Sequence, residues 1–288
     1  MRQYLDCVPC YFRQAIQAGR LAGADDALIR RILEEIGALL PDIPDDSTPP
    51  YMASMIHRRI RELTGVTDPY HERKRESTGL ALRMMPDIRR IIDEAPDPLF
   101  MAVKAAIAGN IIDYGVKGII DIEREVLEIM NHDLAIDDFE ALRSALEDAD
   151  DILYLADNTG ETVFDRLLIE RLDGRKITYA VRSIPILNDA TVEDAMDVGI
   201  DKVVKEIVPS GCEAPGTVLD QCSDDFRARF RDASLIISKG QGNYESISDE
   251  TRGGIFFLLQ AKCAVIASDI GVDIGGLILM ENNPVMES

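Results

Sequence analysis

Apolar residues recur at three- and four-residue spacings through the first half of the chain, which is the period of an α-helix. Residues 1–147 are therefore predicted to be helical, most clearly in YFRQAIQAGRLAG, DDALIRRILEEIGALL, MASMIHRRIRELTG and DDFEALRSALEDAD. The breaks suit helix boundaries: Thr48 and the prolines of PDIPDDSTPP (41–50) can start a helix, and APDP precedes a helical pattern in LFMAVKAAIAGNIIDYG. Asp137 or Asp138 is the predicted cap of the last of these helices.

From about residue 150, short β-prone runs alternate with helical stretches. The predicted strands are DILYLA (151–156), KITYAVR (176–182), KVVKEIV (202–208), SLIIS (234–238), FFLLQ and CAVIAS. Runs that are apolar throughout and separated by helices predict a parallel sheet covered on both faces. The predicted fold class is therefore α/β. A helical N-terminal domain (1–147) precedes a Rossmann-like three-layer α/β/α domain (148–288) with a mostly parallel sheet, which is predicted to bind metal and phosphate and to be catalytic.

Composition and charge narrow the function classes. The 288 residues are 46% hydrophobic and 29% charged, which is typical of a soluble globular protein. With 31 Lys and Arg against 52 Asp and Glu, the net charge is −21, which argues against a nucleic-acid partner. The basic cluster within 57–76 is interpreted as solvated helix faces. No apolar run predicts a membrane span or a secretory signal, and five cysteines, an odd number, predict reduced thiols in the cytoplasm.

Polar and glycine-rich segments follow four consecutive predicted strands. In an open parallel sheet, ligands bind beyond the carboxyl ends of the strands. Each segment alone is equally typical of a turn, but four at one rim predict an active site. In chain order they contain Asp157, Asn158, Gly160 and Glu161; Arg182, Asn188 and Asp189; PSGCEAPGT (209–217); and Lys239, Gly240, Gly242 and Asn243.

The donor atoms in these segments suit a hard cation and an anion. Asp157, Asn158 and Asp189 offer only oxygen ligands, which Mg²⁺, Mn²⁺ and similar ions prefer. The three histidines all lie in the first half of the chain, which argues against a His-rich zinc site. Lys239, the amides of 240–243 and the helix start after Gly160 supply positive potential, and Arg182 can grip a phosphate or carboxylate in a bidentate manner. This set predicts metal-assisted hydrolysis at phosphorus.

Five ordered motifs resemble the damage-control phosphatase family, which was long catalogued as a domain of unknown function and is also fused to some eukaryotic pantothenate kinases. They are GNIIDYG (109–115), ADNTGE (156–161), LNDAT (187–191), SGCEAPGT (210–217) and SKGQGNYE (238–245). Cys7-Val8-Pro9-Cys10 and DPYHERK (68–74) resemble the archaeal and bacterial branch, which carries an N-terminal CxxC. The resemblance covers nearly the whole chain.

The resemblance implies a metal-dependent phosphatase that acts on small phosphorylated metabolites. It implies that Asp157, Asn158 and Asp189 are the metal ligands and that Lys239 contacts phosphate. Cys212 departs from the small polar residue expected at its position, which leaves a side-chain role there in doubt.

Further candidates keep more than one interpretation. Asn110 and Asp113, three apart on a predicted helix, either line the cleft between the domains or pin the helix to the second domain. Glu161 is a general base, an orienting residue or an acid favoured by the helix dipole. The full predicted set is catalytic Asp157, Glu161 and Asp189, with substrate-binding Asn110, Asp113, Arg182, Asn188, Lys239, Gly240, Gly242 and Asn243.

The Cys7/Cys10 pair and Lys262 are less certain members of a site. CxxC is half of a zinc site or a redox pair in many proteins, but no second CxxC is present. Structural thiols, a metal or redox role, and lining of the cleft all remain open. Lys262 is interpreted as a surface lysine that could add charge at the site.

The predicted function is hydrolysis of small phosphorylated metabolites by a water that a divalent metal (Mn²⁺, Co²⁺, Ni²⁺ or Mg²⁺) activates. A covalent mechanism with Asp157 as nucleophile remains open. The alternatives are a non-catalytic metal- or anion-binding protein and a nucleotide-dependent transferase, although ADNTGET lacks GxGxxG and GxxxxGK[ST]. The physiological substrate and the oligomeric state are not predicted.

Overall fold

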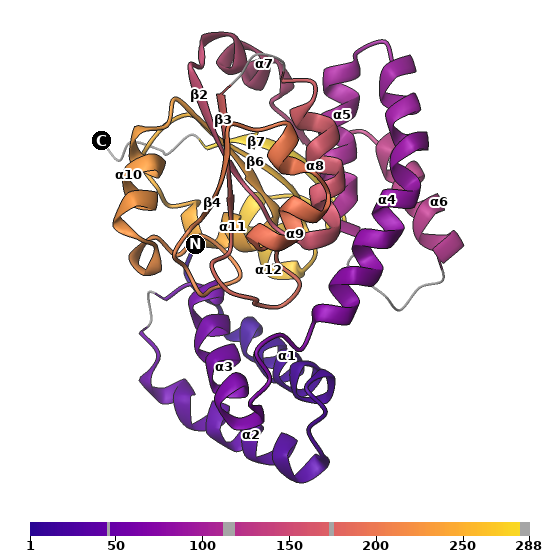
Figure 1. Cartoon of the computed structure of the whole chain (residues 1–288). Helices are drawn as coiled ribbons and strands as arrows, with labels where there is room; N and C mark the ends of the chain where they lie inside the picture. The colour runs from indigo at the N-terminus through magenta and orange to yellow at the C-terminus, as the bar shows by residue number, and fades with distance from the viewer. Residues whose placement is uncertain (45–46, 112–118, 173–175, 283–288) are drawn as a thin grey trace.

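The computed structural model describes residues 1–44, 47–111, 119–172 and 176–282 (Figure 1). Its seven-stranded sheet has the order β1-β7-β6-β5-β2-β3-β4, and every neighbouring pair is parallel except β6 and β7. The strands are β1 (Ile136–Asp137), β2 (Asp151–Leu155), β3 (Lys176–Val181), β4 (Glu206–Pro209), β5 (Leu235–Lys239), β6 (Ile255–Gln260) and β7 (Leu277–Glu281). This mixed α/β fold with a mostly parallel sheet confirms the predicted fold class.

Helices cover both faces of this sheet. The helices are α1 (Val8–Leu21), α2 (Asp26–Leu39), α3 (Pro49–Thr64), α4 (His71–Glu94), α5 (Pro98–Ala108), α6 (Ile119–Asn131), α7 (Phe139–Asp148), α8 (Thr162–Ile169), α9 (Val192–Asp197), α10 (Asp224–Asp232), α11 (Gly240–Ile247) and α12 (Ala264–Ile270). Tyr154 and Tyr179 share one core with α4–α9, whereas Leu153 and Leu155 share another with α10–α12. The two cores follow from the alternation of side chains along each strand.

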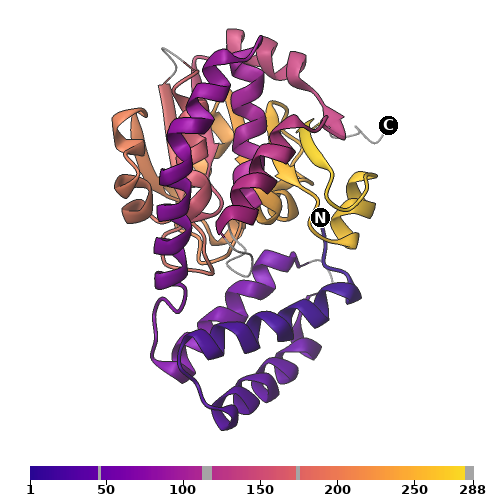
Figure 2. The same ribbon diagram turned by 90° about the vertical axis from the view of Figure 1, so that its right-hand side faces the viewer.

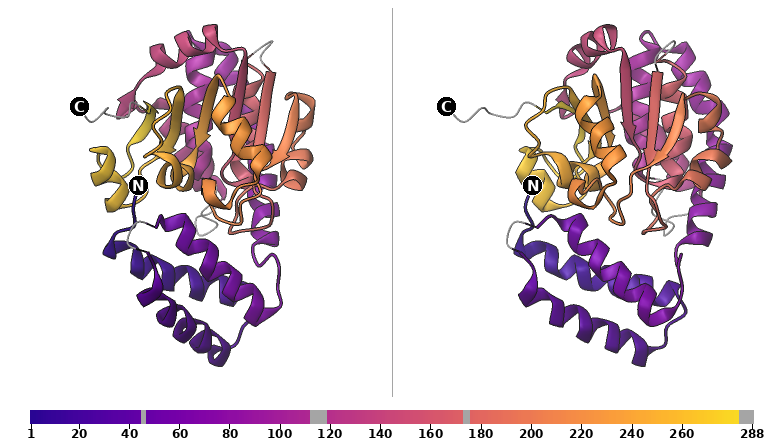
Figure 3. Two further views of the ribbon diagram at one scale, coloured as in Figure 1. Left: turned by 90° about the vertical axis from the view of Figure 1, so that its left-hand side faces the viewer. Right: turned by 60° about the vertical axis from the view of Figure 1, so that its left-hand side comes forward.

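The helical half of the chain divides between two cores. Helices α1–α3 form a small bundle beneath the carboxyl ends of the strands, with its own core around Ile32, Ile36, Met52 and Ile56 (Figure 2, Figure 3). Helices α4–α7 instead pack onto one face of the sheet. The hydrophobic cores thus separate α1–α3 from the rest, whereas the domain boundary between residues 147 and 148 stays a prediction.

Several local predictions can be compared with the structure. Thr48 caps α3 by accepting a hydrogen bond from the Tyr51 amide, and the Asp137 carboxylate accepts one from the amide of Phe139, the first residue of α7. The strand prediction for CAVIAS is wrong, because these residues start helix α12 and β7 takes the place in the sheet. The strand predicted over 202–208 is shorter, since residues 200–202 form a 3₁₀ turn.

Across the described ranges, no helix combines the length and apolar character needed to cross a membrane.

Phe257 tests the packing of the core beneath α11. Its side chain is fully buried in β6 and meets the Tyr244 ring edge-on at 5.1 Å. Phe257→Ala should lower the free energy of unfolding by roughly 3–5 kcal/mol, because it removes an aromatic side chain and leaves a cavity. Urea unfolding measures this loss, with Leu5→Ala as the control, since Leu5 is 89% exposed. A loss no larger than that of the control would contradict the packing.

Candidate active site

The candidate site lies where the order of the strands reverses. β2 is the first strand of the parallel core and pairs with β3 on one side and β5 on the other. Asp157 follows β2, and Lys239 is the last residue of β5. The carboxyl ends of strands at such a switch point form the crevice in which open α/β sheets bind ligands.

The backbone brings the three predicted metal ligands together. Asn158 and Asp189 pair in an isolated β-bridge, and the Ala190 amide donates to the Asp157 carbonyl at 2.8 Å. The carbonyl of Asn188 accepts from the Thr159 amide at 2.8 Å, so this residue contributes its backbone to the bridge. The side chains of Asp157, Asn158 and Asp189 are all buried.

Two asparagine amides lie between two carboxylates of the site. Asn158 Nδ2 donates to Asp157 Oδ2 at 2.9 Å and to Glu161 Oε1 at 2.6 Å. Asn110 Nδ2 donates to the same two oxygens, at 3.2 Å to Asp157 and by a short contact to Glu161. The Nδ2 groups of both asparagines thus face the negatively charged oxygens of Asp157 and Glu161. Asn110 Oδ1 is buried and has no hydrogen-bond partner in the described part of the chain.

The two predicted anion-binding cations form buried ion pairs. Lys239 Nζ lies 2.8 Å from both Glu161 Oε2 and Asp165 Oδ1 and has no exposed surface. Arg182 Nε donates to Asp189 Oδ2 at 2.6 Å, and its Nη2 donates to Asn243 Oδ1 at 3.1 Å. Both cations therefore neutralise carboxylates inside the protein, and their predicted contact with substrate stays a prediction.

Glycines allow the closest approaches in the site. Gly240 begins α11 with φ +76°, and a Cβ built there would lie 1.8 Å from Asp157 Oδ2. A Cβ on Gly242 would lie 2.1 Å from the carbonyl oxygen of Pro215. The side chain of Asn243 then holds this turn, since its Nδ2 donates to the carbonyls of Lys239 at 2.7 Å and Ala156 at 3.0 Å.

Burial changes the acidity of the carboxyl groups. It raises the pKa of Asp157 to about 6, with a further contribution from the charge of Asp189. Burial also raises the pKa of Glu161 to about 7, against the opposing charge of Lys239. The pKa of Asp189 is raised by burial in spite of its pairing with Arg182.

The buried charges of the site do not balance. Fully ionised, its four buried carboxylates exceed its two buried cations: Asp157, Glu161, Asp165 and Asp189 against Arg182 and Lys239. The half-buried Lys262 offsets one of the two surplus negative charges. A bound cation would offset this surplus, and the donor set of carboxylate and amide oxygens suits a hard divalent ion. Within the described ranges, no group of three or more His, Cys, Asp or Glu is arranged to hold a metal. The predicted set has only two such residues, because its third member is Asn158.

Some predictions about candidate residues differ from the structure or stay untested. Helix α5 ends at Ala108, and Asn110 lies in a 3₁₀ turn, so the helix predicted to carry both Asn110 and Asp113 is wrong at Asn110. Asp113 lies outside the described residues. Cys7 and Cys10 are half-buried free thiols at the start of α1, and burial raises the pKa of Cys7, with smaller contributions from Glu245 and Cys263. The role of this pair stays open.

Sequence reasoning missed Asp165 and undervalued Lys262. Asp165 is fully buried and lies one helical turn after Glu161, a spacing that could have indicated a shared face. Lys262 is half-buried, and its Nζ donates to the carbonyl oxygen of Asn110 at 3.2 Å. The charge of Lys262 opposes the rise in pKa of Asp157 and Glu161, so this lysine belongs to the site.

The loop that carries Asp189 contains a strained residue. Leu187 has φ +47°, and it is the one non-glycine residue with positive φ in the ranges that the structure covers. This conformation is unfavourable for a bulky side chain. The Leu187 side chain packs against the core of α1–α3, so the helical bundle contacts the chain two residues before Asp189.

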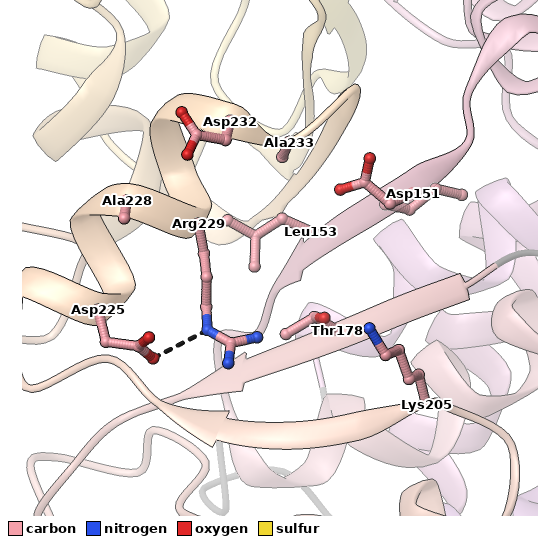
Figure 4. Close-up of a pocket in the computed structure, with 10 residues that line it drawn as sticks. Asp151, Leu153, Thr178, Lys205, Asp225, Ala228, Arg229, Asp232 and Ala233 are labelled. Atoms are coloured by element: carbon pink, nitrogen blue, oxygen red, sulfur yellow. Dashed lines mark hydrogen bonds and ion pairs between the residues drawn. The ribbon is translucent and has the colours of Figure 1, made fainter.

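A separate hollow of about 400 Å³ lies at the opposite end of β2, between α10 and the sheet (Figure 4). Its charged groups are already paired: Arg229 contacts Asp225 at 2.9 Å and Glu206 at 2.7 Å. Asp151 accepts a hydrogen bond from the Ser234 hydroxyl at 2.6 Å. This hollow is at the amino end of the parallel strands, where open sheets do not usually bind ligands.

The fold and the site define an α/β protein with a buried, acidic and amide-lined centre at the switch point of its sheet. Residues 4–278 match the model of a family described as the damage-control phosphatase ARMT1-like domain. The chain belongs to this family.

Curated relatives and a solved structure agree with this membership. The chain is 35% identical to a damage-control phosphatase of Archaeoglobus fulgidus, over 94% of this chain and 96% of the relative. It is 34% identical to a damage-control phosphatase of Pyrococcus horikoshii, over 98% and 99% of the two chains. The crystal structure of a DUF89 family protein from P. horikoshii is similar with a TM-score of 0.90 and 32% identity, covering 98% of this chain and 100% of that one.

Gly240 provides a direct test of the site's geometry. Gly240→Ala should lower the free energy of unfolding by about 1–2 kcal/mol from the left-handed backbone alone, with a further loss from the clash with Asp157. Gly253→Ala is the matched control, because a Cβ there meets nothing within 4 Å. Urea unfolding and a crystal structure of each variant measure the two effects. An undisplaced Asp157 carboxylate in Gly240→Ala would contradict this geometry.

Proposed function

We propose that this chain is a metal-dependent phosphatase that hydrolyses small phosphorylated metabolites in the cytoplasm. Membership of the damage-control phosphatase family supports the reaction, and two relatives that match over nearly their whole length carry that name. The observation that carries the metal dependence is the surplus of buried negative charge at the strand ends. In a low-dielectric site, such a surplus favours a bound cation.

Asp157, Asn158 and Asp189 would hold the divalent ion, with Mn²⁺, Co²⁺, Ni²⁺ and Mg²⁺ as the candidates. When bound, such an ion offsets the charge of a phosphate group and makes a water more acidic. The chain's own part is to fix these donors. The β-bridge between Asn158 and Asp189 sets the spacing of these two residues. Arg182 Nε donates a hydrogen bond to Asp189 Oδ2 and so holds the carboxylate in place.

The phosphate group would bind next to Asp157. The first amides of α11, at 240–242, precede the first intrahelical hydrogen bond, and their N–H groups point out of the helix N-terminus, as anion sites require. Lys262 adds a positive charge on the same side. Asn110 Oδ1, which has no hydrogen-bond partner among the described residues, can accept a hydrogen bond from the substrate.

Glu161 would accept or donate the proton during hydrolysis. Burial raises its pKa to about 7, so that its Oε atoms can take or release a proton near neutral pH. Lys239 holds one of these oxygens and the two asparagine amides hold the other, which keeps the carboxyl group fixed during the transfer. Water is largely excluded, since Glu161 is 1% exposed.

A panel of phosphorylated metabolites and an aryl phosphate tests the activity. The purified protein should release phosphate when one of the four metals is added and should stop when EDTA is present. If no ester is hydrolysed with any of these metals, the chain is a binding protein and not a phosphatase.

Replacing the first ligand should remove metal binding and turnover together. Asp157→Ala should weaken Mn²⁺ binding by more than about 100-fold, because losing a ligand exceeds the 10–100-fold effect of losing an outer partner. Calorimetry measures the affinity and an aryl phosphate assay the turnover, with the exposed Asp201→Ala as control. Unchanged Mn²⁺ affinity in Asp157→Ala would exclude Asp157 as a ligand.

The raised pKa values of the buried carboxyl groups predict how stability varies with pH. A folded-state pKa above the unfolded value favours the folded state at low pH, and this contribution is lost as pH rises through the folded pKa. For Glu161 the window runs from its ordinary value of 4.5 to about 7. In EDTA, the free energy of unfolding should therefore fall across this window by at most a few kcal/mol, at about 1.4 kcal/mol per pKa unit.

Glu161→Gln separates this contribution from those of other acids. Urea unfolding from pH 4.5 to 7.5 should show a flatter profile for the variant than for the wild type. Equal slopes would mean that Glu161 does not titrate in this window. Added Mn²⁺ should stabilise the wild type more at pH 7.5 than at pH 5, because the ion competes with protons.

A further inference from the structure

Asp165 is a buried carboxylate of the site that accepts three side-chain hydrogen bonds, although none of the predicted roles includes it. Its side chain has no exposed surface. Oδ1 accepts hydrogen bonds from Tyr154 Oη at 2.7 Å and Lys239 Nζ at 2.8 Å. Oδ2 accepts one from Tyr179 Oη at 2.8 Å. All three partners are donors, so a carboxylate satisfies them fully.

These bonds join the elements that build the site. Tyr154 lies on β2, Tyr179 on β3 and Lys239 at the end of β5, which are three neighbouring strands in the sheet. Asp165 itself lies on α8, the helix that follows the Asp157–Glu161 segment. The two tyrosine rings stack at 5.3 Å, which fixes the direction of their hydroxyl groups. One buried carboxylate on α8 thus links three neighbouring strands.

The connection continues from Asp165 to the metal ligands through Lys239. The Lys239 ammonium group bridges Asp165 and Glu161, and Glu161 in turn holds the amides of Asn158 and Asn110. Without Asp165, Lys239 would keep Glu161 as its one carboxylate partner among the bonds described here. Loss of Asp165 would therefore leave the ammonium group, and with it the Glu161 carboxylate that holds both amides, less firmly positioned.

We propose that Asp165 is a positioning residue of the site, which fixes Lys239 and, through it, the orientation of Glu161 and Asn158. The inference rests on the proposed function, because it concerns the same metal centre. Within the described residues, the hydrogen bonds of Asp165 go to Tyr154, Tyr179 and Lys239 and not to Asp157, Asn158 or Asp189. Its effect is exerted through the ammonium group of Lys239.

Asp165→Asn is the first test, since it keeps the shape of the side chain and removes its charge. Mn²⁺ affinity measured by calorimetry should fall about 10- to 100-fold, the usual effect of losing a partner that orients a ligand. The kcat for an aryl phosphate should fall more than KM rises, because substrate binding does not involve Asp165.

A purely structural role would give a different pattern. Leu146→Ala removes a buried side chain from α7, on the same face of the sheet but away from the strand ends, and should destabilise the fold by roughly 2–5 kcal/mol. Its Mn²⁺ affinity should equal that of the wild type. If Asp165→Asn also binds Mn²⁺ as the wild type does, whatever its stability, the proposal is overturned.

The tyrosines provide a second test if Asp165→Asn does not fold. The double variant Tyr154→Phe and Tyr179→Phe removes two of the three donors to Asp165 and changes no charge. Its Mn²⁺ affinity should fall about 10-fold, and wild-type affinity would overturn the proposal. If the wild type itself binds none of Mn²⁺, Co²⁺, Ni²⁺ and Mg²⁺, the proposed function fails and this inference fails with it.

Discussion

Lys239 forms the ion pair on which the rest of the site depends. Its ammonium group has no exposed surface and lies at equal distance from Glu161 and Asp165. A buried charge is tolerated only when it is paired and hydrogen-bonded. Glu161 and Asp165 must therefore both stay within hydrogen-bond distance of the Lys239 ammonium group. Glu161 in turn positions the amides of Asn158 and Asn110, and Asp165 positions the hydroxyl groups of the two tyrosines.

The carboxylate surplus explains why so many backbone features meet at this point. Asp157 can approach the start of α11 because residue 240 is a glycine. Asp189 reaches the same place because Leu187 accepts a left-handed conformation and reverses the chain. The glycine at residue 240 and the left-handed conformation of Leu187 each lower stability locally, and the packing of the sheet must compensate for that loss. This arrangement is typical of functional sites, where a fold tolerates strain for the sake of geometry.

The sequence predicted the parts of this structure that local rules govern. Apolar periodicity correctly predicted α1–α3 and the central strands β2, β3 and β5, and it placed Asp157 and Lys239 at the carboxyl ends of β2 and β5. The errors arose where tertiary contacts decide. CAVIAS is as apolar as a strand, but Cys263 and Gly271 bound a short helix there, and β7 closes the sheet in the opposite direction. The spacing of Asp165 from Glu161 could indicate only a shared face, because its hydrogen-bond partners come from three strands that are distant in the sequence. Lys262 resembles any solvated lysine until the 3₁₀ turn at Asn110 is located.

The contact between Leu187 and the core of α1–α3 has a consequence for how this protein can diversify. Because the Leu187 side chain packs against the core of the helical bundle, the bundle is in direct contact with the loop two residues before Asp189. A substitution that repacks the bundle core around Leu187 would therefore also displace the loop that carries Asp189.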